Sequence, residues 1–237
     1  MDKLLRIDVD TNQRPRARGD ICVSFSELLW SGPVAVQPCG LILAHGAGAP
    51  MDSPFMSEMA GRLGELGVRV VRFEFPYMAS RRRDGGKRPP SPQTQLLDCW
   101  REVWREVNAR EPGRWAIGGK SMGGRMASLL ADELDAPALV CLGYPFHAAG
   151  KPEKTRVEHL AALRTPTLIV QGERDALGCR AEVAGYALSP AIRMLWLEAA
   201  DHDLKPLRVS GFSHAQHLQR TAEAVAGFLG EAVCASA

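Results

Sequence analysis

Short apolar runs alternate with segments of helical periodicity along most of this chain of 237 residues. An apolar run without regular polar interruption is typical of a strand that is buried on both faces of a sheet. Further opening strands are expected between residues 20 and 44, where Pro and Gly break the apolar runs. We predict the remaining strands at residues 41–44, 68–73, 114–118, 138–142, 167–170 and 192–197.

Between these strands, apolar residues recur three or four positions apart, which is the spacing of one helix face. Four helices follow from this pattern, and Gly67 ends the first of them as a C-cap. Alternating strands and helices predict an α/β fold with a mostly parallel sheet covered on both faces. The four apolar stripes comprise Phe55, Met56, Met59, Ala60, Leu63 and Leu66; Leu96, Leu97, Trp100, Val103, Trp104 and Val107; Met122, Met126, Leu129 and Leu130; and Leu218, Ala222, Val225 and Phe228.

Residues 74–92 depart from this alternation, because they are rich in arginine and proline and lack an apolar stripe. We predict that they form a polar loop that passes over the edge of the sheet and does not link two domains. The chain length suits one large α/β domain. Residues 1–237 are therefore predicted to form a single domain, with its core at about residues 20–232.

The composition excludes several functional classes. Twenty-nine basic and 27 acidic residues give a formal net charge of +2, so we expect no partner among nucleic acids or membranes. No apolar run is long enough to span a bilayer, and acidic residues interrupt the first positions, where a signal peptide needs an apolar core. Six scattered cysteines without metal-ligand spacing predict reduced thiols, no metal site and a cytoplasmic location.

The most informative motif is Gly119-Lys120-Ser121-Met122-Gly123, which lies between a predicted strand and a predicted helix. This G-x-S-x-G pattern is typical of a nucleophile elbow, a turn so tight that it lifts the serine hydroxyl clear of the sheet. Serine is a weak nucleophile until a base lies within reach of its oxygen. The motif therefore predicts a histidine base and an acid elsewhere in the chain.

Chain order offers a test, because hydrolases with this turn place their acid and then their histidine after the serine. Asp175 and His202 occur in that order, each just beyond the end of a predicted strand. Catalytic groups gather at this edge of open α/β sheets. Asp175 has an alternative role as a helix cap, and Glu173 and Asp203 are competing acids for the imidazole.

An oxyanion in acyl transfer needs backbone N–H donors next to the nucleophile. Met122, directly after the serine, is expected to supply one of them. The second is expected from Ala47, with Gly48 as the alternative, in the loop after the strand at 41–44. His45 opens that loop but precedes the serine in the chain, so we predict a structural imidazole that bonds the loop.

Arg81, Arg82 and Arg83 form the densest group of positive charges, inside the predicted polar loop. One interpretation is that they recognise a carboxylate or phosphate group on the substrate. The alternative is a solvated loop that its charges keep soluble. We favour this alternative, because it explains the composition without a ligand.

Three segments of the chain resemble a small bacterial branch of the α/β-hydrolase superfamily that is related to dienelactone hydrolases. The eukaryotic testis-expressed protein 30 looks similar to this branch. The resemblance spans roughly residues 20–232 and implies a three-layer fold with about eight strands, a triad at Ser121, Asp175 and His202, and no cofactor. Dienelactone hydrolases use a cysteine nucleophile, so their particular lactone is not implied. The segments are His45-Gly46-Ala47-Gly48, Gly119-Lys120-Ser121-Met122-Gly123-Gly124-Arg125 and Gln171-Gly172-Glu173-Arg174-Asp175.

Only about thirty residues separate the strand at 138–142 from Asp175, too few for the helical lid of lipases. We therefore expect no large cap domain and a shallow, open pocket that suits a small acyl substrate. The leading hypothesis is a serine hydrolase that cleaves an ester, thioester or related acyl bond through an acyl-enzyme. Two alternatives are acyl transfer or perhydrolysis at the same triad, and an interaction module that keeps only the hydrolase scaffold.

Overall fold

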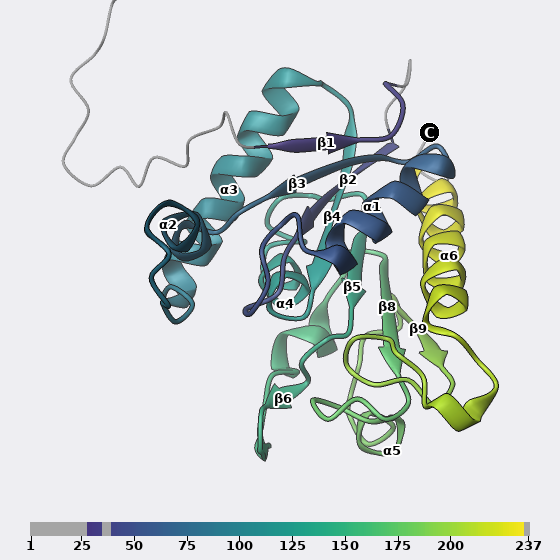
Figure 1. The fold of residues 1–237 in the computed structure, drawn as a ribbon. Helices are drawn as coiled ribbons and strands as arrows, with labels where there is room; N and C mark the ends of the chain where they lie inside the picture. Colours follow the sequence, from purple (N-terminus) through teal and green to yellow (C-terminus); the bar gives the residue numbers. More distant parts are fainter. Residues whose placement is uncertain (1–27, 35–38, 235–237) are drawn as a thin grey trace, which may run out of the picture.

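A computed structural model describes residues 28–34 and 39–234. Its centre is a seven-stranded sheet in the order β1-β3-β2-β4-β5-β8-β9 (Figure 1). β1 runs antiparallel to β3, and all other neighbouring strands are parallel. The strands are β1 (Leu29–Ser31), β2 (Cys39–Ala44), β3 (Arg69–Phe73), β4 (Arg114–Lys120), β5 (Leu139–Leu142), β8 (Thr167–Gly172) and β9 (Ile192–Leu197).

The prediction of a mostly parallel sheet is therefore confirmed, and every strand predicted after residue 40 is present. The resemblance implied about eight strands, whereas the described residues form seven in this sheet. Of the predicted opening strands, the described part contains β1 and the start of β2. Residues 20–27 and 35–38 lie outside the described residues.

Helices cover both faces of the sheet, as predicted (Figure 1). α1 (Pro54–Glu65) and α6 (His214–Cys234) pack on one face, and α3 (Gln93–Arg110) and α4 (Met122–Ser128) pack on the other. Successive β2 residues point to opposite faces of the sheet. Leu41 and Leu43 pack in the core beneath α1 and α6, and Ile42 and Ala44 pack in the core beneath α3 and α4. Gly67 follows α1 with φ 85°, the left-handed conformation expected of a glycine at a helix end.

The order of the strands explains where a site can form. β2 lies between β3 and β4, because the chain places β3 on one side of β2 and then crosses to the other side for β4. At such a switch point the loops after two adjacent parallel strands run in opposite directions and leave a crevice. The loops that follow β2 and β4 border this crevice, and they contain the predicted oxyanion segment and the predicted elbow.

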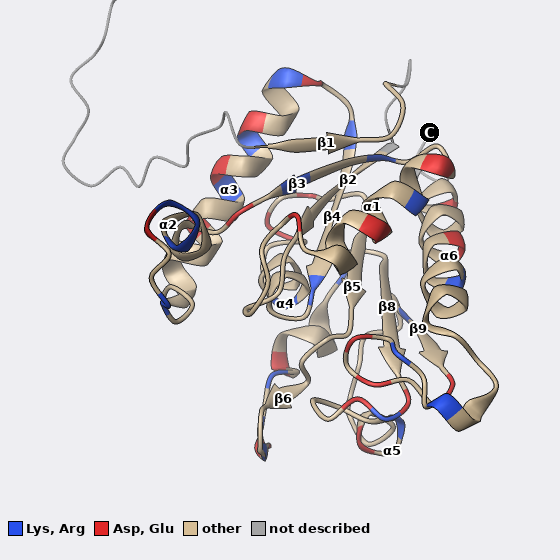
Figure 2. Cartoon of the chain, in the orientation of Figure 1, with Lys and Arg blue, Asp and Glu red and all other residues tan. Residues whose placement is uncertain are grey.

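The prediction of a loop over residues 74–92 is wrong for half of the segment. α2 (Pro76–Asp84) forms there and includes Arg81, Arg82 and Arg83, and much of its ribbon is coloured blue for basic residues in Figure 2. Proline in the first turn costs no intrahelical hydrogen bond. Gly85 ends the helix at φ 70°, and its N–H donates to the carbonyl oxygen of Arg81. Pro76 and Gly85 thus mark the start and the end of this helix, although it has no long apolar stripe.

The segment between β5 and β8 contains no large cap, as the sequence predicts. It holds a short antiparallel hairpin of β6 (His147–Ala148) and β7 (Lys151–Thr155) and a 3-10 turn at Glu158–Ala162. The remaining short elements are α5 (Arg180–Val183) and a 3-10 turn at Arg208–Ser210. Within the described ranges, none of the helices combines the length and apolarity that crossing a bilayer requires.

Candidate active site

Ser121 occupies the turn between β4 and α4, in a backbone conformation of φ 51° and ψ −117°. Such a conformation is strained for a residue with a side chain. The turn is also crowded: a Cβ at Gly123 would lie 2.6 Å from the carbonyl oxygen of Ala44, and a Cβ at Gly119 would lie 2.5 Å from the carbonyl carbon of Gly123. Only glycine fits at these two positions, which explains the G-x-S-x-G spacing.

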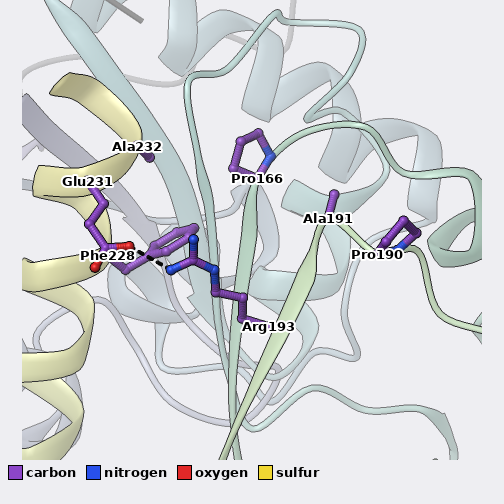
Figure 3. A pocket seen from close by; sticks show the side chains of 7 residues that line it. All are labelled: Pro166, Pro190, Ala191, Arg193, Phe228, Glu231 and Ala232. Atoms are coloured by element: carbon purple, nitrogen blue, oxygen red, sulfur yellow. Dashed lines mark hydrogen bonds and ion pairs between the residues drawn. The ribbon is translucent and has the colours of Figure 1, made fainter. Parts of the chain in front are cut away.

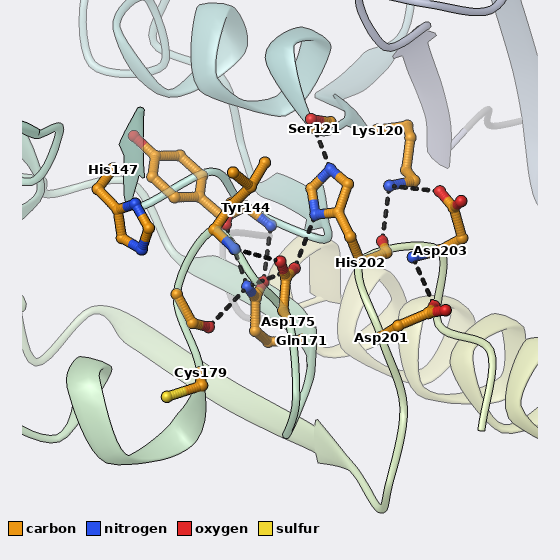
Figure 4. Close-up of polar contacts among 12 residues, drawn as sticks. Lys120, Ser121, Tyr144, His147, Gln171, Asp175, Cys179, Asp201, His202 and Asp203 are labelled. Carbon is orange, nitrogen blue, oxygen red and sulfur yellow. Dashed lines mark hydrogen bonds and ion pairs between the residues drawn. The ribbon is translucent and has the colours of Figure 1, made fainter. Parts of the chain in front are cut away.

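The structure brings together the three predicted catalytic side chains, which come from three different strand ends (Figure 4). His202 Nε2 lies 2.8 Å from Ser121 Oγ, and His202 Nδ1 lies 2.7 Å from Asp175 Oδ2. An ionised carboxylate only accepts, so the Nδ1–H donates to Asp175. Nε2 is then free to accept the hydroxyl proton of Ser121, which is the arrangement that general-base activation requires.

Asp175 is fully buried, and its two oxygens have separate partners. Oδ1 accepts the N–H of Leu177 at 2.8 Å and so closes a turn, whereas the helix that follows, α5, begins at Arg180 with Cys179 as its N-cap. The alternative role of Asp175 as a helix cap is therefore wrong. Oδ2 accepts from His202 and from Gln171 Nε2 at 2.8 Å. A buried carboxylate with this many donors is held in one orientation. Asp175 can therefore orient the imidazole without relaxing into solvent.

The two competing acids point elsewhere. Glu173 accepts from Arg180 at 2.7 Å and from the N–H of Ala199 at 3.2 Å. Asp203 forms an ion pair with Lys120 at 3.2 Å and has a mostly exposed side chain. Neither is hydrogen-bonded to the imidazole, so among the described acids Asp175 is the one that meets it.

A turn within the loop after β9 fixes the backbone that carries His202. Asp201 Oδ1 accepts the N–H groups of Asp203 at 2.9 Å and Lys205 at 3.0 Å. This side-chain turn fixes the backbone on both sides of His202. Leu204 adopts φ 60° in the same loop. The imidazole therefore extends from a turn whose shape is set locally.

The loop after β2 is held by two side chains beneath it. His45 is buried, its Nδ1 donates to the carbonyl oxygen of Gly46 at 2.6 Å, and its Nε2 accepts the N–H of Phe75 at 3.1 Å. Burial lowers the pKa of His45, which keeps the imidazole neutral and able to make both bonds. Tyr77 Oη donates to the carbonyl oxygen of Ala47 at 2.9 Å. His45 is thus the structural imidazole that we predicted.

These anchors decide the direction of the loop's N–H groups. In a trans peptide the N–H points opposite to the preceding carbonyl. The carbonyl oxygen of Gly46 faces His45 in the interior, so the N–H of Ala47 faces the other way, toward solvent. Ala47 is exposed and borders the same cavity as Ser121. Met122 begins α4, where an N–H has no acceptor within the helix.

A cavity of about 320 Å³ opens beside the serine. Its wall is formed by the loop after β2, the start of α1 and the histidine loop, and most of its side chains are small. Phe55 and Met56 are the large apolar side chains in it, and Lys120 is the basic one. A cavity of this size at a switch point of an α/β sheet is the usual place for a small ligand.

A second cavity of similar volume lies at the opposite edge of the sheet (Figure 3). It is bordered by Pro166 and Ala191, which precede β8 and β9, and by Phe228 of α6. An ion pair between Arg193 and Glu231 at 2.6 Å closes one side. The candidate catalytic groups lie at the other ends of these strands, so this cavity has no part in their chemistry.

The structure does not bring the arginine cluster to the serine. Arg82 forms ion pairs with the buried Glu74 at 2.6 Å and with Asp52 at 2.8 Å, which raise the pKa of its guanidinium. Arg83 donates to Ser80 within the same helix. None of the three predicted arginines lines the cavity beside Ser121 among the described residues. Arg82 therefore has its partners on the protein, and it lies on a helix and not in the solvated loop that we preferred.

Sequence reasoning missed three residues that support the site, namely Lys120, Gln171 and Tyr77. Gln171 continues the apolar run of β8, and it is completely buried. A polar residue at the end of a buried strand must find hydrogen-bond partners. This signal was readable from the sequence, whereas the partner of Tyr77 depends on where α2 packs.

Comparisons with known proteins agree with this geometry. A family model described as an alpha/beta hydrolase domain matches residues 37–230. The structure of Est1E from Butyrivibrio proteoclasticus superposes with a TM-score of 0.67 at 17% identity, covering 87% of this chain and 94% of that one. Dienelactone hydrolase from Anabaena variabilis superposes with a TM-score of 0.63 at 18% identity, covering 86% and 90%.

A third similar structure is a serine hydrolase without a lid from Xanthomonas campestris, with a TM-score of 0.59 at 20% identity and coverage of 87% of this chain and 86% of that one. At these identities the structural matches show the fold alone. The family match covers most of the chain and includes the elbow, the acid and the histidine. The chain therefore belongs to the alpha/beta hydrolase domain family.

Proposed function

We propose that this protein is a serine hydrolase that cleaves a small ester, thioester or related acyl bond. The observation that carries the proposal is the continuous hydrogen-bonded path from Ser121 through His202 to the buried Asp175, beside an open cavity. Structurally similar proteins described as a serine hydrolase and a dienelactone hydrolase support it. Fold alone does not determine function, so the site geometry bears the main weight.

In the proposed reaction Ser121 Oγ attacks the acyl carbonyl carbon while its proton passes to His202 Nε2. The carbonyl electron pair moves onto oxygen to give a tetrahedral oxyanion. When this collapses, the leaving alkoxide or thiolate takes the proton from His202, and an acyl-enzyme remains on Ser121. Water then repeats the two steps, releasing a carboxylic acid and restoring the serine. Asp175 orients and stabilises the imidazolium throughout.

The oxyanion is proposed to bind the N–H groups of Ala47 and Met122. Both belong to short backbone segments next to Ser121, one before α1 and one at the first turn of α4. Donors that are already fixed before the reaction stabilise developing charge without reorganisation. The anchoring of the Ala47 loop by His45 and Tyr77 supports this role.

The size of the cavity favours a small acyl group. About 320 Å³ is at the lower end of the range for ligand pockets, and no cap covers it. The aromatic ring of Phe55 and the thioether of Met56 offer apolar contact for a short chain. The proposed substrates are therefore small esters or thioesters and not long lipid chains.

Removing the nucleophile tests the proposal. Ser121→Ala should lower turnover of p-nitrophenyl acetate by roughly 10⁴-fold or more, since the triad acts as a unit. It should also abolish labelling by a fluorophosphonate probe. Ser91→Ala, a serine outside the site, is the matched control and should retain both. Activity that survives in Ser121→Ala, or wild-type protein that stays unlabelled, would contradict the proposal and favour an interaction module.

A further inference from the structure

Lys120 is a buried cation next to the proposed nucleophile. Its side chain is only 9% exposed although it directly precedes Ser121. Burial lowers the pKa of Lys120, and the nearby carboxylate of Asp203 opposes that shift. Burying an ammonium group is costly unless it is paired and hydrogen-bonded. The proposed reaction needs no lysine, so this position requires another explanation.

The contacts of Lys120 connect two parts of the proposed site (Figure 4). Its Nζ donates to the backbone carbonyl oxygen of His202 at 2.7 Å and lies 3.2 Å from Asp203 Oδ1. It also faces the ring of Phe55, with Nζ 5.6 Å from the ring centre. An ammonium has three N–H groups. Two acceptors and one ring face therefore surround the ammonium, whose side chain also borders the cavity beside Ser121.

The opposite side of this contact is closed by Gly143, the first residue after β5. A Cβ at Gly143 would lie 2.7 Å from the carbonyl oxygen of His202 and 3.2 Å from Lys120 Nζ. Its φ of 65° also favours glycine. The carbonyl of His202 is thus enclosed by the backbone after β5 and by the ammonium. The distance between imidazole and serine depends on where this carbonyl is held.

We propose that Lys120 is a positioning residue that ties the histidine loop to the strand carrying the nucleophile. This inference rests on the proposed hydrolase function. Lys120 is the neighbour of Ser121 in the chain, and its ammonium donates a hydrogen bond to the backbone carbonyl oxygen of His202. The turn at Asp201 fixes the shape of the loop, and His217 Nδ1, 3.2 Å from the carbonyl oxygen of Leu204, ties it to α6. Among the described residues, the bond from Lys120 is the one that ties the backbone of this loop to β4.

The charges around Lys120 allow it to be replaced without leaving a buried carboxylate unpaired. Asp203 and Asp201 face it from the histidine loop and Asp175 from the loop after β8. Asp203 is 74% exposed, so water can solvate its carboxylate when the lysine is replaced. Removing one partner of an ion pair is strongly destabilising when the other charge stays buried, which is not the case for the exposed Asp203. Lys120→Met should therefore fold.

The experiment compares Lys120→Met with Lys205→Met, a matched control. Lys205 lies in the same loop but is exposed, and its backbone, not its side chain, makes the turn contact. We expect Lys120→Met to lower kcat for p-nitrophenyl acetate by roughly 10²-fold with little change in KM, because a small displacement of a reacting group has this effect. The rate of fluorophosphonate labelling should fall by a similar factor, and Lys205→Met should match the wild type in both.

Two results would overturn the inference. One is an unchanged kcat and labelling rate in folded Lys120→Met. The other is a raised KM for esters with an anionic acyl group at unchanged kcat, which would make Lys120 a substrate-binding residue. If Lys120→Met does not fold, Lys120→Gln takes its place, because its shorter side chain keeps a donor but cannot reach the same carbonyl.

A second measurement separates this inference from the proposed function. The Nδ1–H of His202 should give a downfield proton NMR signal, assigned by its loss in His202→Gln. We expect the signal to weaken or disappear in Lys120→Met and to persist in Lys205→Met. Wild-type protein that resists the fluorophosphonate would refute the hydrolase function only. A full signal in Lys120→Met would refute the positioning role whatever the activity.

Discussion

Gln171 offers the sharpest test of the packing beneath the site. Its side-chain amide is completely buried and makes four hydrogen bonds. Oε1 accepts the N–H of Tyr144 at 2.7 Å. The two N–H groups of Nε2 are shared among three acceptors, Asp175 Oδ2 at 2.8 Å and the carbonyl oxygens of Tyr144 and Gly178 at 3.1 Å. One amide thus joins the loop after β5 to the loop that holds the acid.

Gln171→Leu keeps a similar volume and removes all four bonds. Three backbone groups and one carboxylate oxygen then lose a partner in the interior. Each buried group left without its partner costs on the order of 1 kcal/mol, and more when it is charged. We therefore expect the free energy of unfolding to fall by about 4 kcal/mol. For a domain of this size, that corresponds to a melting temperature lower by roughly 10 °C.

The assay is thermal and urea unfolding of three variants beside the wild type. Gln95→Leu, in the first turn of α3, is the control and should stay within about 0.5 kcal/mol of the wild type. Gln171→Glu keeps the shape but places a second carboxyl group against Asp175. Its deficit should grow as the pH rises and that group ionises. A loss below about 1 kcal/mol in Gln171→Leu would refute the reasoning, because the amide would then not be holding buried partners.

Two further predictions concern the loop after β2. Tyr77→Phe removes the hydrogen bond to the carbonyl oxygen of Ala47. We expect kcat to fall roughly tenfold at unchanged KM, which corresponds to about 1.4 kcal/mol of transition-state stabilisation. A change in KM alone, measured by steady-state kinetics, would contradict this. Burial lowers the pKa of His45, so the unfolded chain binds a proton there that the folded chain excludes. The free energy of unfolding should therefore decrease as the pH falls below the ordinary histidine pKa of about 6.5. The urea midpoints at pH 7.5 and 5.5 should differ less in His45→Gln than in the wild type, because the glutamine amide can keep both bonds but does not titrate.

Sequence patterns predicted the sheet and its main helices because burial on two faces leaves a simple signature. Unbroken apolar runs such as 138–142 are typical of strands covered on both sides, and their alternation with helix stripes favours a parallel sheet. α2 was missed for the opposite reason. Its residues between Pro76 and Asp84 have no long apolar stripe, and its two end signals were interpreted as loop composition.

Chain order and the positions of the strand ends were enough to predict the main residues of the candidate site. Ser121, Asp175 and His202 were named because each follows a strand, and the structure brings them together. The choice of Asp175 over Glu173 depends on which way each side chain points from one short turn, and no periodicity encodes that direction. The partners of Lys120 are likewise invisible in sequence, because they are 82 residues away.

The strained backbone of Ser121 restricts which side chains this position can accept over evolutionary time. A residue at φ 51° and ψ −117° with glycine backbones packed against its turn tolerates a small, unbranched side chain best. Threonine would add a methyl group to a conformation that β-branched residues avoid. We therefore expect related sequences to vary in the surrounding loops, while this position stays confined to serine or cysteine.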